Sequence, residues 1–505
     1  MKLVYHKTIL KGSLFFFIGS LVSKLFSYIY NVFIARYFGP ETYGIFVLSL
    51  TVLSFGGMFS KLGVHSALIR FISYYSAKGD DTKVKGSILS AFYIVLCASL
   101  VVSVIIYSMS DIISAHLFKR NVGFILKILS MTIPFTSIFF VISFSFIGFK
   151  KMEYHVMFSY VGQNLIRVII IVIFGLIFGD ILGLTIAYAI SEITIALIAF
   201  YFFYRIIMSR FSEIISVRVT GELMSFSLPL LVSSFLGFFL SYTDRLMLGY
   251  FMSPVEVALY DAGLRLAMIT TMFTAGIVSL FYPVITEIFA KKDIKMLKIL
   301  FIDVNKWSLY ISLPIASSLI LFPGFALILS FGNEYIDART VLQILSIKFL
   351  IDIFLTTSFN MITSIGRVAY VAIINVIAII LNVSMNYFLI PVYGIEGAAI
   401  STLTVTAFGV VLSSGVIYRY VRVHQYGIYI LKGSISAFIP LLILKFIKPS
   451  SFFLFISPVM LLISYVLLLL IFRGFDSTDI EIIKLIERKL NMKFGILRNI
   501  MKRFI

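Results

Sequence analysis

The chain has 505 residues, of which 60% are hydrophobic and only 13% charged, and its mean hydropathy is +1.06. A soluble domain carries about 25% charged residues, so this composition excludes a soluble globular protein and predicts a polytopic membrane protein. The net charge of +19 is typical of lysine and arginine collected in cytoplasmic loops, which argues against nucleic acid as a partner.

Apolar segments long enough to cross a membrane follow one another along the whole chain. A spanning helix needs roughly 20 apolar residues, and about fourteen such segments are present. The predicted spans are residues 12–38, 43–59 (extending towards Arg70), 86–107, 124–149, 156–178, 182–204, 223–251, 255–285, 307–331, 341–365, 368–391, 397–418, 428–446 and 452–472. The predicted fold class is therefore an all-α membrane protein.

The loops between these spans alternate in charge, with Lys119-Arg120 and Lys445 with Lys448 as exceptions. Those predicted to lie inside are basic, as at Lys78, Lys150 and Arg205, whereas 249–256 and 391–396 contain no lysine or arginine. The pattern predicts an even number of spans in the cell membrane, with both termini in the cytoplasm.

A polar signature occurs twice within apolar segments. Asn31 is followed six positions later by Tyr37-Phe38, and Asp244, which lies 213 positions after Asn31, is followed six positions later by Tyr250-Phe251. The turn at Gly179-Asp180 has a counterpart near Gly394 at a similar offset. Because each half contains six spans, the halves point the same way through the bilayer. They form two lobes related by an axis along the membrane normal, with a cleft between them.

This repeat divides the chain into four parts. We predict an N-terminal six-helix lobe at 1–210, a C-terminal six-helix lobe at 211–424 and two additional transmembrane helices at 425–475. The last part, 476–505, is a basic segment with apolar residues at helical spacing, which predicts an amphipathic cytoplasmic tail on the anionic leaflet or on a partner.

No catalytic constellation is present in the sequence. The five histidines and single cysteine form no metal-ligand pattern, and no phosphate-binding glycine loop occurs. We therefore predict no catalytic residues, no metal, no cofactor and no enzymatic activity.

The candidate functional residues are polar side chains inside apolar segments, where a charge facing lipid is disfavoured. The substrate-cavity candidates are Lys24, Asn31, Arg36, Arg167, Asp244, Arg245, Lys348, Asn382 and Asn386. The candidates for ion coupling are Glu192, Asp244 and Asp352. Alternatives remain open: Arg36, Arg70 and Arg265 lie where they can extend to lipid headgroups, and Asn382 and Asn386 are spaced for hydrogen bonds between helices.

The deep cations slightly outnumber the deep acids. A cavity lined by lysine and arginine suits a phosphate-bearing or acidic-sugar ligand. A cation-coupled drug exporter would instead keep carboxylates in its cavity.

Several motifs together resemble polysaccharide-biosynthesis flippases of the multidrug/oligosaccharidyl-lipid/polysaccharide exporter superfamily. The run from Asn31 to Gly44 is similar to their first-loop signature, and Lys61-Leu62-Gly63-Val64 and Phe281-Tyr282-Pro283 match further motifs. The most specific stretch runs from Leu381-Asn382 to Pro391 and on through 394–399. The resemblance covers nearly the whole chain.

This resemblance implies two lobes with alternating access, and transfer of a polyprenyl-linked oligosaccharide from the inner to the outer leaflet. The implied partners are the lipid-linked oligosaccharide, membrane lipids, and glycosyltransferases or a polymerase of the same pathway. Peptidoglycan-precursor flippases carry an Arg-Asp pair where this chain has Tyr30-Asn31, and drug extruders commonly have an aspartate in the first span. The alternatives are a cation-coupled small-molecule exporter and a membrane-embedded glycan polymerase.

Overall fold

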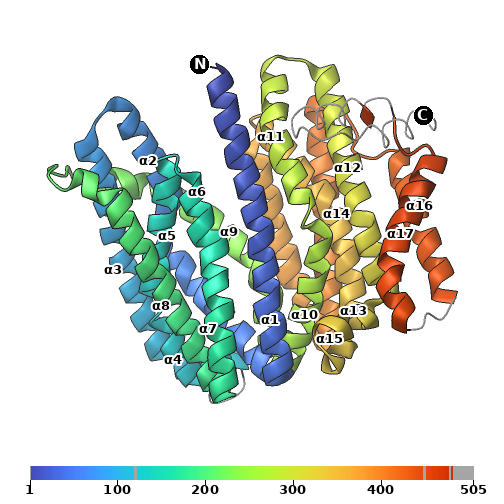
Figure 1. The fold of residues 1–505 in the computed structure, drawn as a ribbon, viewed down its shortest axis with the longest axis horizontal. Coiled ribbons are helices and arrows are strands. Elements are labelled where there is room, and N and C mark those ends of the chain that lie inside the picture. Colours follow the sequence, from blue (N-terminus) through green and yellow to red (C-terminus); the bar gives the residue numbers. More distant parts are fainter. Residues whose placement is uncertain (1, 119–121, 447–450, 477–478, 481–505) are drawn as a thin grey trace. The chain divides into compact units, whose positions relative to one another are not determined.

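The structure, a computed structural model, describes residues 2–118, 122–446, 451–476 and 479–480, and within these ranges every regular element is a helix (Figure 1). An apolar chain in lipid has no water to satisfy its backbone, and a helix satisfies its own N–H and C=O groups. The predicted all-α fold class is therefore confirmed. The predicted tail at 476–505 lies almost wholly outside the described residues.

The elements follow the order of the predicted spans. They are α1 (Lys2–Lys61), α2 (Val64–Lys78), α3 (Asp81–Ile113), η1 (Ser114–Phe118), α4 (Gly123–Ser130), α5 (Ile133–Gly148), α6 (Met152–His155), η2 (Val156–Gly162), α7 (Gln163–Phe178), α8 (Ile181–Ile206), η3 (Met208–Phe211), α9 (Thr220–Phe251), α10 (Pro254–Ala267), η4 (Met268–Thr271), α11 (Thr274–Ala290), α12 (Ile294–Leu321), α13 (Pro323–Ser330), η5 (Asn333–Ala338), α14 (Arg339–Ser364), α15 (Val368–Val421), α16 (Ile428–Phe446) and α17 (Ser451–Ile471).

The predicted spans fall on these helices, although helices and spans do not correspond one to one. The elements α1 and α15, each broken at one glycine, contain two predicted spans apiece, whereas the predicted span 255–285 is divided among α10, η4 and α11. By length and apolar composition, nine helices in the described part of the chain are able to cross a membrane. The number fourteen is thus an approximate count of spans.

The long helices are broken where the repeat predicts turns. Gly39 interrupts α1 with φ 78° and ψ 171°, and in the second copy α9 ends at Phe251 before α10 begins at Pro254. Gly179, with φ 65°, ends α7, and Gly394, with φ 57°, interrupts α15. Glycine adopts positive φ values without a steric penalty, which accounts for three of these four breaks, whereas the break between α9 and α10 contains no glycine.

By its internal contacts the chain forms two compact units. The first unit comprises Met1–Arg265, Leu327–Val341 and Ala372–Val405, and the second comprises Leu266–Ala326, Leu342–Val371 and Thr406–Ile505. The two units are defined by contacts between residues, whereas the predicted lobes are defined by the sequence repeat. The lobe boundaries given above therefore stay predictions.

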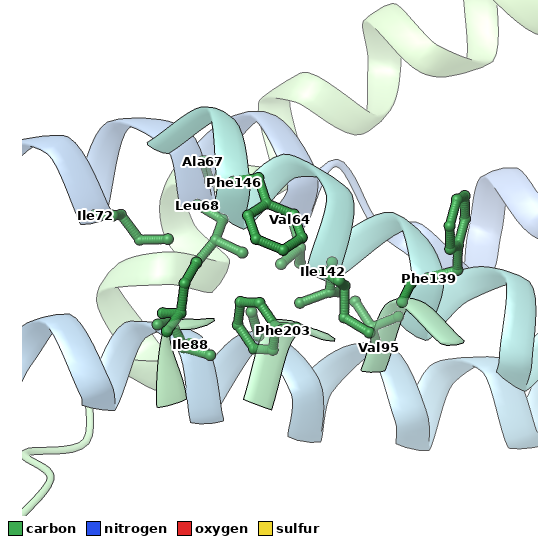
Figure 2. Packing of buried hydrophobic residues seen from close by; sticks show 14 of the residues in the cluster. Val64, Ala67, Leu68, Ile72, Ile88, Val95, Phe139, Ile142, Phe146 and Phe203 are labelled. Atoms are coloured by element: carbon green, nitrogen blue, oxygen red, sulfur yellow. The ribbon is translucent and has the colours of Figure 1, made fainter. Parts of the chain in front are cut away.

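The first unit has an apolar core formed by α2, α3, α5 and α8 (Figure 2). Leu68, Ile142 and Phe146 are fully buried. The rings of Phe146 and Phe203 meet edge to face, with centroids 5.7 Å apart. This close packing holds the four helices together.

The second unit is organised around α12, which packs against α11 and α16. Lys306 of α12 is buried, and its Nζ lies 2.8 Å from carboxylate oxygens of both Asp476 and Asp479 and 3.3 Å from Asp303. The Trp307 indole donates to Asp479 over 2.9 Å. Because Lys306 occupies the centre of the three carboxylates, the cluster is an ion-pair network that fastens the segment after α17 to α12.

Replacing Phe146 with alanine is expected to destabilise the first unit by about 3–5 kcal/mol, because the change opens a cavity in a close-packed core. Thermal unfolding of the purified protein in detergent measures this change. The matched control is Phe388→Ala, at a side chain that is 70% exposed, which is expected to stay within about 0.5 kcal/mol of the parent. Equal losses for both variants would contradict the assignment of this core.

Candidate functional site

Asp244 of α9 lies at a meeting point of polar side chains in the first unit. Its Oδ1 accepts hydrogen bonds from the side-chain amides of Asn382 (3.2 Å) and Asn386 (2.8 Å). Its Oδ2 accepts from the hydroxyls of Tyr260 and Thr402, each at 2.6 Å. The signature aspartate thus binds donors from α10 and from both halves of α15.

The four donors around Asp244 are all neutral. Four hydrogen bonds stabilise a carboxylate, yet none of these four donors carries a positive charge that would neutralise it. The Oδ1 atom of the buried Asn386 has no hydrogen-bond partner among the residues that the structure describes. A buried acceptor beside an acid marks a place where a further donor or a cation would be stabilised.

A second cluster surrounds Asp261 of α10, whose side chain is completely buried. Arg245 Nη2 lies 2.7 Å from Asp261 Oδ1, and Arg265 pairs with Oδ2. The hydroxyl of Tyr43 donates to the same Oδ2 over 2.6 Å and lies 3.4 Å from Oδ1 of Asn31. One buried acid therefore balances two arginines and binds the second part of α1 through Tyr43, whose hydroxyl also approaches Asn31 in the first part.

This cluster gives the cavity candidate Arg245 a partner, Asp261. It also corrects the expectation for Arg265, which pairs with Asp261 one helical turn away and does not extend to lipid headgroups. Such a pair replaces part of the hydration that both charges lose on burial.

A third cluster joins α7 to α8. Arg167 Nε lies 2.5 Å from Glu192 Oε1, and Glu192 is 1% exposed. Gln163 donates to Glu192 over 3.1 Å, and the Arg167 guanidinium lies 5.3 Å from the ring centroid of Tyr188. A substrate-cavity candidate and a coupling candidate are thus paired with each other.

The remaining candidates lie apart from these clusters. Arg36 donates to the carbonyl oxygens of Ile328, Leu329 and Ser330, and Lys24 lies on α1 with an exposed side chain. In the second unit, Lys348 Nζ is 3.6 Å from Asp352 Oδ2, one turn along α14.

Sequence reasoning missed Tyr43, Tyr260, Asp261 and Thr402 in the first two clusters and Tyr188 in the third. A usable signal existed for Asp261, because an acid inside the predicted span 255–285 is as costly as the acids that were selected. No such signal exists for a tyrosine or threonine, which apolar helices tolerate without a partner.

Replacing Asp261 with asparagine is expected to destabilise the protein by about 3–5 kcal/mol, because it leaves Arg245 and Arg265 without their shared counter-charge. Thermal unfolding in detergent and the amount of protein in membranes both report the loss. Asp337→Asn, which makes the same change at an exposed position, serves as control. Parent-like stability of the Asp261 variant would show that the two arginines have other partners.

Comparisons with known proteins give the family context. The family model described as "Polysaccharide biosynthesis protein" matches residues 9–289, and the MatE model matches 229–388. An uncharacterized membrane protein, MJ1068 of Methanocaldococcus jannaschii, is 24% identical and covers 79% of this chain and 82% of its own. A putative O-antigen transporter of Shigella flexneri is 23% identical over 78% of this chain and 94% of its own. The probable low-salt glycan biosynthesis flippase Agl15 of Haloferax volcanii is 24% identical over 41% and 44%.

Solved structures share the fold. The lipid II flippase MurJ in an inward closed conformation superposes with a TM-score of 0.73 at 16% identity, covering 95% of this chain and all of that one. An inward-facing multidrug resistance MATE transporter gives 0.63 at 15% identity, covering 79% and 94%. The apolar helices and these relatives make the chain a multi-pass membrane protein. Since the first family model spans more than half of its length, the chain belongs to the polysaccharide biosynthesis protein family.

Proposed function

We propose that the protein is a flippase. It transfers a polyprenyl-(pyro)phosphate-linked oligosaccharide from the cytoplasmic to the outer leaflet by alternating access, for assembly of a surface polysaccharide or a glycoprotein glycan. The family supports this proposal, as do relatives named as a glycan biosynthesis flippase and an O-antigen transporter. The better superposition on a lipid II flippase than on a multidrug transporter is consistent with it.

The observation that carries the proposal is a set of polar clusters inside an otherwise apolar helical unit. Asp244, Asp261 and Glu192 each sit among donors from other helices or helix segments. A phosphate-linked glycan that crossed lipid unaided would lose its hydration at great cost. Fixed polar groups within a membrane protein lower that cost while the lipid tail remains in the bilayer.

We assign different roles to the two copies of the polar signature: headgroup binding to the first and ion coupling to the second. Lys24, whose side chain is exposed, lies on the first span, and we assign it to the glycan-phosphate headgroup. Asn31, expected beside it, is fully buried against Tyr43 and is not accessible to a headgroup in this conformation. The headgroup is anionic, so an ammonium with free access suits it better than an arginine that is already paired.

Asp244 is the proposed coupling residue. Its neighbours Asn382, Asn386 and Thr402 provide amide and hydroxyl oxygens, and hard cations prefer such oxygens together with a carboxylate. A proton or cation bound here would neutralise a charge that only neutral donors now stabilise. Glu192 and Asp352 are weaker coupling candidates, because Arg167 and Lys348 already balance them.

The proposal places the protein in the cytoplasmic membrane with both termini in the cytoplasm. Its lipid-linked substrate is made on the inner face and consumed outside. Glycosyltransferases and a polymerase of the same pathway are therefore the proposed functional partners.

Deletion of the gene is expected to trap lipid-linked glycan in the inner leaflet. Lipids are extracted from cells with and without prior exposure to periodate, an oxidant that does not cross the membrane and destroys only outward-facing glycan. Periodate-resistant lipid-linked glycan should accumulate in the deletion strain and return to the parental level when the gene is restored. Absence of such accumulation would count against the flippase proposal.

Asp244→Asn is expected to abolish complementation of the deletion strain while the protein is still made and folded, because asparagine keeps the shape of the side chain and removes its charge. Glycan flipping and protein abundance are measured together, with the exposed Asp337→Asn as control. Full activity of the Asp244 variant would exclude this residue from coupling.

The alternative of a cation-coupled small-molecule exporter is favoured by one observation, the MatE match over residues 229–388. That alternative requires the acids Asp244 and Glu192 and has no need of Lys24. Loss of flipping in Lys24→Met, with drug sensitivity unchanged, would separate the two functions in favour of the flippase.

A further inference from the structure

Arg36 makes an unusual connection between distant parts of the first unit. Its Nε donates to the carbonyl oxygen of Ser330 over 2.7 Å, and its Nη2 donates to those of Ile328 (2.8 Å) and Leu329 (2.5 Å). These carbonyls form the C-terminal end of α13, where a helix has no backbone donors of its own to offer. A guanidinium satisfies them and also complements the negative end of the helix dipole.

Two further hydrogen bonds hold the same segments together. The hydroxyl of Tyr28 donates to Ser330 Oγ over 2.6 Å, and the hydroxyl of Tyr335 donates to the carbonyl oxygen of Ala35 over 3.2 Å. We refer to these two bonds and the three of Arg36 as the Arg36 latch. The latch joins the first predicted span to the end of the ninth predicted span and the segment after it, nearly 300 positions along the chain.

Aromatic rings fill the space beside the latch. Tyr43, Phe331 and Tyr335 are each at most 1% exposed, and the ring of Phe331 lies 5.5 Å from that of Tyr335 and 6.5 Å from that of Tyr43. Tyr28 meets Phe331 edge to face at 6.2 Å. Such a cluster leaves no room for a glycan to pass between these segments.

Arg36 differs from the buried cations in its exposure. Its side chain is exposed and its partners are uncharged carbonyl groups, so water can take over these hydrogen bonds at modest cost. Arg245 and Arg265, by contrast, are paired with a buried carboxylate. The latch is therefore the contact that can open and close, and the Asp261 cluster is the fixed part behind it.

We propose that the Arg36 latch is the outer gate of the flippase and that Arg36 is a gating residue rather than a ligand of the glycan headgroup. The assignment rests on the proposed function and its topology, which places the Gly39-Pro40 turn and residues 332–340 on the outer side. A headgroup that leaves towards the outer leaflet must pass between the two sequence halves. The latch links those halves at this end, so it has to release for transport to proceed.

The test measures access to a cysteine placed behind the latch. In a Cys97→Ser background, Ala35→Cys introduces a thiol at a position that is fully buried, and intact cells are treated with a membrane-impermeant maleimide. Adding Arg36→Gln is expected to raise the labelling rate of this cysteine about tenfold, because hydrogen bonds from a charged donor shift such equilibria by at least that order. Arg36→Lys should give an intermediate rate, since an ammonium cannot reproduce the planar fork.

Two controls accompany this measurement. Arg339→Gln makes the same chemical change at an exposed arginine beyond the latch and should leave the labelling rate at the parental value. Asp337→Cys, at an exposed position of η5, should be labelled from outside at the same rate with and without Arg36→Gln, which also shows that the variant protein is folded. Tyr335→Phe, which removes a single hydroxyl, provides a milder variant and should raise the labelling rate less than Arg36→Gln.

An unchanged labelling rate at position 35 in both Arg36→Gln and Tyr335→Phe would overturn the gate. Labelling of Asp337→Cys only from the cytoplasmic side would overturn its placement on the outer face. Failure of the flippase proposal itself has a separate signature, the absence of trapped lipid-linked glycan in the deletion strain, which does not depend on any cysteine.

Discussion

The Asp261 carboxylate has no access to solvent and lies in a unit built from helices that are apolar enough to span a membrane. A charge in such a place persists only if other groups replace its hydration. Arg245, Arg265 and the Tyr43 hydroxyl do so. Meeting this requirement brings the two parts of α1 to α9 and α10, and thereby sets the framework within which the other polar residues of the first unit lie.

The Asp244 site and the Arg36 latch differ from this fixed cluster in what surrounds them. Asp244 has four neutral donors, so its charge is stabilised but not cancelled. Arg36 is exposed and binds neutral carbonyls. A transporter needs both kinds of contact: a stable centre, and charges whose partners can be exchanged during the cycle.

In the second unit, too, a buried charge is balanced by charges of opposite sign. Lys306 is buried among three carboxylates and fastens the segment after α17 to α12. The two additional helices are therefore held to the bundle by an ion-pair network as well as by apolar packing around Tyr310 and Tyr465.

The sequence by itself determined the all-α membrane fold, the approximate number of spans and the family. The length of the apolar segments and the order of the motifs are properties of the sequence alone. It also selected Asp244, Asn382 and Asn386, since polar residues in apolar segments are costly wherever they point. Only the tertiary structure decided which of them meet. Asp261 and Tyr43 lie 218 positions apart. Arg36 binds backbone carbonyl groups of α13, which no pattern of side chains predicts. Backbone acceptors and tyrosine hydroxyls carry no sequence signal, so their partners emerge only when distant helices pack.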